Sequence, residues 1–162
     1  MTVSAFAPAT VANLGPGFDV LGLSLDGLGD TVTVEFCQEA GVHIGSITGD
    51  NGVLPTDPFL NTASVAARAT LRAAGVDANL RIHIQKGLPL CSGLGSSAAS
   101  AAAAAFATNI IIGNPLRKHD LVEPCIEAES IVSGRHADNV APSLLGGLIL
   151  VRSLNPIDLV RL

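Results

Sequence analysis

The segment from residue 80 to residue 109 most constrains the fold, because it joins a strand, a glycine-rich loop and a helix. Residues 80–86 alternate apolar and polar side chains, which is the pattern of a half-buried strand. Gly93 and Gly95 permit a tight loop, and the small residues of 96–109 predict a helix directly after it. The sequence therefore predicts a loop held at a helix amino terminus, where unpaired backbone N–H groups attract anions.

The other predicted elements surround this segment. Residues 31–36 alternate strictly and predict a second strand. Weaker strand patterns fall at 2–6, 18–25, 42–48 and 146–152, and helical patterns at 61–74 and 119–133, where Pro124 must either begin the helix or kink it. Strands come first and are followed by a β-α-β-α-α-β order, which predicts an α+β fold with a mixed sheet and helices packed on one face.

The composition restricts how the core can be built. The 162 residues are within the size of one domain, and 48% are hydrophobic against 14% charged, which excludes a disordered chain. There is no Trp or Tyr and there are only five Phe, so Ala, Val, Leu and Ile must fill the core. We therefore expect many close contacts between small side chains.

The net charge of −5 and the scarcity of aromatic residues argue against nucleic acid as a partner. A phosphate ligand would have to be bound by backbone amides and a metal. Cys37, Cys91 and Cys125 lie far apart without metal-ligand spacing, which favours reduced thiols. The longest apolar run, residues 98–107, is too short to span a bilayer, and the first residues lack a signal-peptide pattern. We therefore expect no membrane partner and a cytoplasmic location.

A first cluster with chemical potential is the loop from Lys86 to Ala99, KGLPLCSGLGSSAA. Its glycines let the backbone approach a ligand, and Ser96 or Ser97 can offer a hydroxyl to phosphate or magnesium. The loop lacks the G-K-[ST] ending of a Walker loop and the G-x-G-x-x-G spacing. An ordinary Gly/Ser loop that caps an Ala-rich helix explains the spacing equally well.

A second cluster is the segment from Ala7 to Asp19, APATVANLGPGFD. Its glycines and prolines predict an irregular loop that holds Asn13 and Asp19 on a defined turn, where an amide and a carboxylate can receive an ammonium group. Asn and Asp also satisfy turn backbone in many loops, and for this cluster alone that interpretation is favoured.

A third cluster runs from Glu127 to Pro142. Glu129 offers the carboxylate oxygens that magnesium prefers, while His136, Asp138 and Asn139 can position a hydroxyl for attack. The alternative is a loop after a helix, with the glutamates simply solvated.

Together the three clusters resemble the signatures of the GHMP small-molecule kinases and, within them, the homoserine kinases. Residues 88–99 match the pattern L-P-x-x-x-G-L-G-S-S-A-A, whereas residues 7–19 and the stretch HADNVAP at 136–142 are similar to the homoserine kinase motifs. The resemblance implies the ribosomal-protein-S5-domain-2-like fold of the amino-terminal GHMP kinase domain. It also implies ATP and Mg²⁺ as cofactors and L-homoserine as the substrate, phosphorylated to O-phospho-L-homoserine in threonine biosynthesis.

The resemblance also implies roles for individual residues. Ser97 and Glu129 hold magnesium, and Asn13 and Asp19 receive the homoserine amino group. Asn139, with His136 nearby, orients the attacking hydroxyl, and Asp138 can be read as a general base. The residues expected to bind the ATP phosphates are Pro89, Leu90, Cys91, Ser92, Gly93, Leu94, Gly95, Ser96, Ser97, Ala98 and Ala99.

The chain departs from the family in length and at two positions. Cys91 stands where the family has a smaller or hydroxyl-bearing residue, and Pro124 interrupts the helix that leads to Glu129. The family is about twice as long, which predicts an ATP-binding domain at 1–152 and the start of a linker to a further domain at 153–162. The alternatives are another GHMP kinase with a different alcohol substrate, or a truncated fragment without catalysis. The resemblance allows a homodimer and, for a plant protein, a plastid location after removal of a transit peptide.

Overall fold

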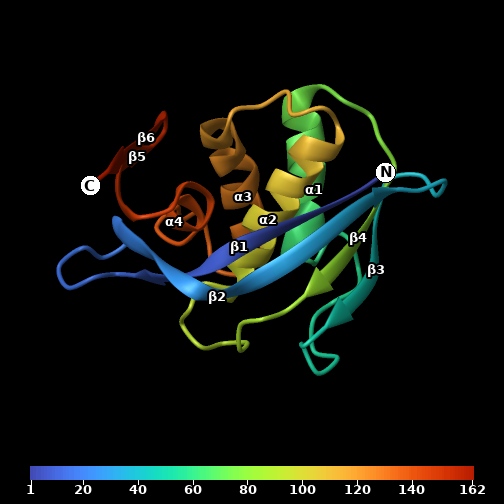
Figure 1. The fold of residues 1–162 in the computed structure, drawn as a ribbon. Helices are drawn as coiled ribbons and strands as arrows, with labels where there is room; N and C mark the ends of the chain where they lie inside the picture. Colours follow the sequence, from blue (N-terminus) through green and yellow to red (C-terminus); the bar gives the residue numbers. More distant parts are fainter.

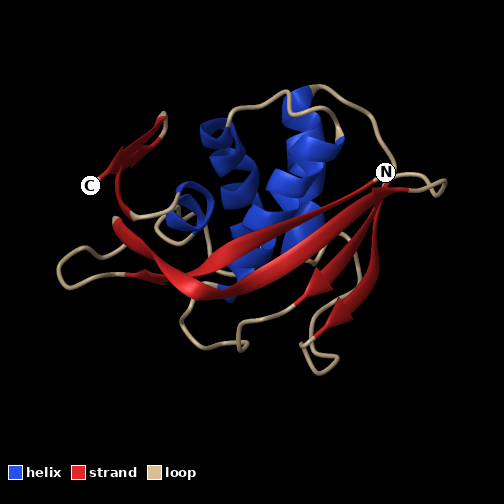
Figure 2. Cartoon of the chain, viewed as in Figure 1, coloured by secondary structure: helices blue, strands red, loops and turns tan.

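One mixed sheet of six strands organises the computed structural model, which describes residues 1–162. The strands are β1 (Thr2–Ala12), β2 (Leu21–Phe36), β3 (Val42–Thr48), β4 (Leu80–Gln85), β5 (Leu148–Leu154) and β6 (Ile157–Arg161). The helices are α1 (Thr62–Ala74), α2 (Ser96–Ile111), α3 (Val122–Glu129) and α4 (Val140–Leu145), with a 3-10 turn η1 (Lys118–Leu121) before α3. The helices lie on one face of the sheet, as predicted (Figures 1 and 2).

The long strand β2 is the centre of the sheet. It pairs antiparallel with β1 along most of its length, with β4 through residues 31–36 and with β5 through residues 21–23. β3 pairs parallel with β4 across α1, and this single parallel pair makes the sheet mixed. The α+β class and the mixed sheet are therefore confirmed.

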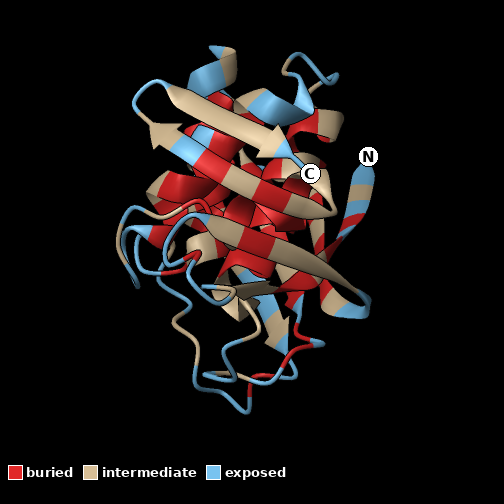
Figure 3. Ribbon diagram, turned by 90° about the vertical axis from the view of Figure 1, so that its left-hand side faces the viewer, coloured by how far each residue is buried: buried red, intermediate tan, exposed pale blue.

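The core lies between the sheet and the helices, where the buried residues concentrate in Figure 3. Helix α2 occupies its middle and contacts α1, α3, β1 and β2. Twelve of the sixteen residues of α2 are buried, and most of these are alanines, so neighbouring elements can approach it from several sides. The expectation of close contacts between small side chains is confirmed.

Two helical segments differ from the sequence-based expectations. The predicted helix at 119–133 is divided, because η1 passes into α3 at Val122 and Pro124 occupies the first turn of α3, where its missing N–H is tolerated. Helix α4 was not predicted, because its six residues are too few for a periodic pattern.

Residues 153–162, expected to begin a linker, instead complete β5 and form β6, which pairs antiparallel with β5. Ile157 and Leu159 also pack against the core, which explains why the segment remains in the sheet. The assignment of 1–152 as an ATP-binding domain stays a prediction. None of the helices is long and apolar enough to cross a membrane.

Candidate active site

The glycine-rich loop runs from the end of β4 to the amino terminus of α2. Cys91, Gly93 and Gly95 all have positive φ, at 55°, 74° and 64°. Gly95 precedes the helix, and no side chain caps its first turn. The amides of that turn therefore remain available to an anion, in the field of a helix of 16 residues.

Gly95 lies where three distant segments meet. The Thr10 amide donates a 3.0 Å hydrogen bond to the Leu94 carbonyl, and the Thr10 hydroxyl donates a 2.8 Å hydrogen bond to Asn139 Oδ1. A Cβ atom on Gly95 would lie 2.1 Å from Thr10 Oγ1 and 2.9 Å from Asn139 Oδ1. The glycine therefore allows β1, the loop and the start of α4 to approach one another.

Glu129, the last residue of α3, points toward the first turn of α2. Its residue is only 5% exposed, and Oε2 accepts 3.1 Å hydrogen bonds from the hydroxyls of Ser97 and Ser133. Glu129 Oε1 and Ser96 Oγ are buried without a hydrogen-bond partner. One unpartnered oxygen therefore lies at the start of α2, directly after the loop, and the other belongs to the carboxylate at the end of α3.

Burial raises the pKa of Glu129, and the Asp138 carboxylate adds to the rise, while the Ser97 and Ser133 hydrogen bonds and the Lys86 ammonium oppose it. A cation at this position would favour the ionised carboxylate. Hydroxyl and carboxylate oxygens fit magnesium, a hard cation that keeps water or phosphate in its remaining positions. No group of three or more His, Cys, Asp or Glu side chains forms a dedicated metal cage in the chain.

Asn13 and Asp19 are held by the loop between β1 and β2, both with positive φ of about 60°. Asn13 Oδ1 accepts a 2.8 Å hydrogen bond from the Asp19 amide, so Asn13 does satisfy turn backbone. Asp19 Oδ1 lies 3.7 Å from Nδ1 of His136, which comes from the segment before α4. The second and third clusters therefore meet at the Asp19–His136 pair.

Asp138 and Asn139 immediately precede α4. The Asp138 carbonyl packs over Gly22 of β2, where a Cβ atom would lie 1.5 Å from that oxygen. Asp138 is 3% exposed, and burial raises the pKa of its carboxyl group. Asn139 Oδ1 accepts a hydrogen bond from the Thr10 hydroxyl, which fixes the start of α4 against β1. The close approach of the Asp138 carbonyl to Gly22 fixes it against β2.

A cavity of about 410 Å³ opens beside the glycine-rich loop. Its polar wall contains Ser96, Ser97 and Ser133, and its apolar wall contains Val53 and Leu60 from the segment before α1. Cys91 also lines it and is exposed. A larger groove of about 660 Å³ lies between α1 and β3, but it contains none of the predicted site residues, so the smaller cavity is the candidate site.

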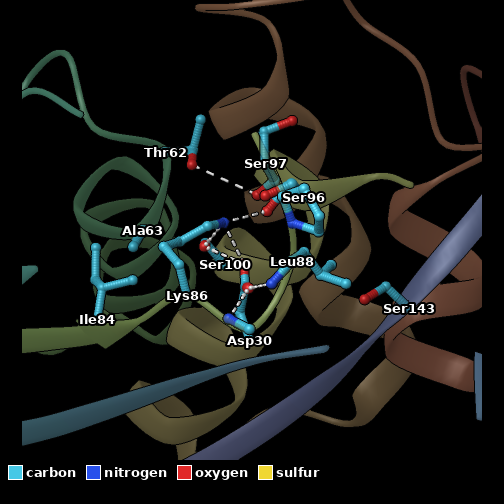
Figure 4. A network of polar contacts seen from close by, with 12 residues as sticks. Asp30, Thr62, Ala63, Ile84, Lys86, Leu88, Ser96, Ser97, Ser100 and Ser143 are labelled. Carbon is cyan, nitrogen blue, oxygen red and sulfur yellow. Dashed lines mark hydrogen bonds and ion pairs between the residues drawn. The ribbon is translucent and has the colours of Figure 1, made fainter. Parts of the chain in front are cut away.

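A buried ion pair that was not predicted lies at the site, between Lys86 and Asp30 (Figure 4). Burial lowers the pKa of the Lys86 ammonium, and the Asp30 carboxylate opposes this change. A signal for the pair was present, because Lys86 continues the inward positions of β4 and Asp30 continues those of β2.

Comparisons with known proteins find relatives in both sequence and structure. The sequence model described as GHMP kinases N terminal domain matches residues 61–147. The chain is 47% identical to the homoserine kinase of Chloroherpeton thalassium, over 98% of this chain and 53% of that protein. It is 53% identical to the homoserine kinase of Arabidopsis thaliana, over 98% of this chain and 44% of that protein. The chain thus spans about half the length of the curated relatives it matches.

Solved structures are similar over the whole chain. The crystal structure of homoserine kinase from Cytophaga hutchinsonii matches with a TM-score of 0.94 and 47% identity, over 99% of this chain and 51% of that one. Mevalonate kinase from Methanococcus jannaschii matches with a TM-score of 0.75 over 100% of this chain and 55% of that one. At 15% identity, this second match is a likeness of fold alone.

Proposed function

Since the chain belongs to the GHMP kinase family, we propose that its protein transfers the γ-phosphoryl group of ATP to the side-chain hydroxyl of L-homoserine. The product is O-phospho-L-homoserine, an intermediate of threonine biosynthesis. The observation that carries the proposal is the identity of 47–53% to homoserine kinases across 98% of the chain. The convergence of all three sequence clusters around the glycine-rich loop supports it.

The ATP phosphates bind to backbone amides of the loop from Ser92 to Ser97, at the amino terminus of α2. These amides supply positive potential without a basic side chain, and residues 92–97 contain no Lys or Arg. The apolar wall of the adjacent cavity, with Val53 and Leu60, receives the adenine ring.

Ser97 and Glu129 hold Mg²⁺ in this proposal. The unpartnered Glu129 Oε1 is the observation that favours them, because a buried carboxylate oxygen without a donor is costly unless a ligand completes it. When bound, the ion neutralises charge on the transferring phosphoryl group.

The homoserine ammonium binds near Asp19, whose exposed carboxylate already faces His136, and Asn13 fixes the turn that carries it. Asn139, held by Thr10, orients the attacking hydroxyl. Asp138 is suited to accept the hydroxyl proton, since burial raises its pKa. Phosphoryl transfer depends mainly on positioning and charge neutralisation, so a strong base is not required.

A panel of acceptor alcohols tests the substrate. ADP release is measured with Mg·ATP and homoserine, its N-acetyl derivative, its methyl ester, mevalonate or galactose. We expect turnover with homoserine alone, because the site is proposed to recognise free amino and carboxylate groups. Equal turnover with the derivatives would identify another kinase of the family.

The panel is run on the 162-residue chain and on this chain fused to the second half of the Chloroherpeton homoserine kinase. Homoserine-dependent turnover by the fusion alone would support the ATP site and assign essential substrate contacts to the added half. A fusion that folds and binds Mg·ATP but phosphorylates none of the acceptors would contradict the proposed reaction. The cytoplasmic or plastid location and a homodimer stay predictions.

A further inference from the structure

A buried ring of three polar side chains lies beneath the glycine-rich loop (Figure 4). Lys86 pairs with Asp30 and also donates a 2.8 Å hydrogen bond to Ser100 Oγ. The Ser100 hydroxyl in turn donates a 2.7 Å hydrogen bond to Asp30 Oδ2. The Lys86 side chain is 2% exposed and the Asp30 side chain 0%, so the ring is removed from solvent.

The Lys86 ammonium has no donor left for a ligand. Its third hydrogen bond, 2.8 Å long, goes to the Ser96 carbonyl in the first turn of α2. An ammonium group has three N–H donors, and Asp30, Ser96 and Ser100 use all three. Although Lys86 belongs to the lining of the cavity, its ammonium is therefore bound to the backbone of α2 and to the ring and has no free N–H group.

The other oxygen of Asp30 holds the opposite end of the loop. Asp30 Oδ1 accepts hydrogen bonds of 3.0 Å from the Gly87 amide and 3.2 Å from the Leu88 amide. The ring is thus tied to the backbone where the loop begins and, through Ser96, where it ends.

Stability alone does not explain this ion pair. A buried pair of charges is often no more stabilising than apolar residues of the same volume, because desolvation opposes the attraction. The surroundings could readily be apolar, since Leu88 and most of α2 are buried hydrophobic residues. What apolar side chains cannot provide is a set of directed hydrogen bonds to both ends of the loop.

We propose that Lys86 is a positioning residue of the nucleotide site, which with Asp30 fixes the two ends of the loop so that its amides converge on the ATP phosphates. This inference rests on the proposed function, since it assumes that the loop binds phosphate. In this role Lys86 keeps the loop in its binding conformation in the absence of ligand, although its ammonium group does not itself have a free donor for phosphate.

The test compares the affinities of ATP and adenosine for the full chain, in the presence of Mg²⁺. Adenosine uses the cavity but not the phosphate loop, so a misplaced loop weakens ATP alone, whereas general unfolding weakens both. The variants are Lys86→Met, which keeps the unbranched side chain except for its terminal charged group, and Ser100→Ala, which removes one partner of the ring. The control is Asn109→Ala, near the other end of α2. The buried Asn109 side chain forms hydrogen bonds with the Asn114 side chain and the Leu116 backbone, away from the loop.

We expect Lys86→Met to weaken ATP binding about tenfold or more and to leave adenosine binding unchanged, because the loop loses charge-assisted hydrogen bonds. Ser100→Ala should weaken ATP about threefold. Asn109→Ala should lower the unfolding temperature without changing the ratio of the two affinities.

An unchanged ratio in a folded Lys86→Met variant would overturn the inference. Where Lys86→Met does not fold, Ser100→Ala decides by the same criterion. A wild-type chain that binds ATP no better than adenosine would instead contradict the proposed function, so the two failures are distinguishable.

Discussion

The Ser97 hydroxyl donates a 3.1 Å hydrogen bond to Glu129 Oε2 and thereby joins the first turn of α2 to the last residue of α3. The other oxygen of the same carboxylate, Oε1, is buried and has no partner. The contact therefore brings an incompletely satisfied negative charge to the loop that we propose to bind phosphate. A site that is complete only with a cation should be less stable without it.

Replacing Glu129 with Gln should separate stability from ligand binding. We expect the ligand-free variant to be more stable at neutral pH by about 1 kcal/mol, because a buried charge is removed. It should also lose most of the stabilisation that Mg·ATP gives to the wild-type chain. Thermal unfolding with and without Mg·ATP measures both effects, and a Glu129→Gln or Glu129→Ala variant with unchanged Mg·ATP binding and full activity would refute the magnesium assignment.

The pH dependence of stability provides a further prediction for Glu129. Its pKa is raised above the ordinary value of 4.5, so the unfolded chain loses this proton at lower pH than the folded chain. Without a cation, stability should therefore fall as pH rises from about the ordinary value through the raised pKa. Chemical denaturation across this pH range should show a smaller fall in the free energy of unfolding for Glu129→Gln than for the wild type. Superimposable pH profiles of the two proteins would contradict a raised pKa of Glu129.

Substitution of two glycines of the loop separates the cost of backbone strain from the cost of a steric clash. Gly93 and Gly95 both have positive φ, but a Cβ atom meets no atom within 4 Å at Gly93, whereas at Gly95 it meets the Thr10–Asn139 pair. We expect Gly93→Ala to cost about 1 kcal/mol of stability from φ alone. Gly95→Ala should cost about 2 kcal/mol more, because it must displace Thr10 or α2. Equal unfolding free energies for the two variants would contradict the packing of Gly95.

The hydrogen bond from Thr10 to Asn139 can be tested by kinetics. If Asn139 orients the attacking hydroxyl, Thr10→Val should lower kcat for homoserine about tenfold and leave KM for ATP unchanged. Thr10→Ser keeps the hydroxyl and serves as the matched control. An effect on KM for ATP alone would instead mean that Thr10 supports the loop, through its amide bond to Leu94.

The exposed thiol of Cys91 reports on the cavity. Cys91 lines the cavity beside the loop, whereas Cys125 is buried, and burial raises the pKa of its thiol. Alkylation by iodoacetamide should therefore be slow at Cys125, and Mg·ATP should slow it at Cys91 but not at Cys37. Peptide mass spectrometry measures the three rates, and a Cys91 rate independent of Mg·ATP would argue against nucleotide in this cavity.

Much of the fold was predictable where local pattern and tertiary structure agree. The alternation at 31–36 and 80–86 and the helical content of 61–74 and 96–109 each correspond to an observed element. The long first part of β2 was underestimated, because Gly22, Gly27 and Gly29 interrupt its alternation, and two of these glycines are required by the close approach of Asp138 and Ala7. Here tertiary packing, and not strand propensity, determines the residue type.

The site was predictable as three motifs but not as one constellation. Spacing alone cannot show that Thr10, Gly95 and Asn139 lie in contact. The three residues are far apart in the sequence and meet only because β1 packs against α2 and α4 in the folded chain. The ion pair of Lys86 and Asp30 was not predicted, because Asp30 precedes the predicted strand 31–36 and charged residues are normally exposed. The available signal was the alternation of the strands. Lys86 lies two residues after the buried Ile84, and Asp30 lies two residues before the buried Val32, so both fall on the inward face.

Whether the glycine-rich loop binds phosphate is tested by NMR of the backbone amides of the labelled chain, titrated with Mg·ATP and, separately, with adenosine. We expect the amides of Gly93, Gly95, Ser96 and Ser97 to shift with Mg·ATP and to change little with adenosine, because phosphate binds to them at the amino terminus of α2. Shifts confined to the groove between α1 and β3, or no shifts with Mg·ATP, would contradict phosphate binding by the loop.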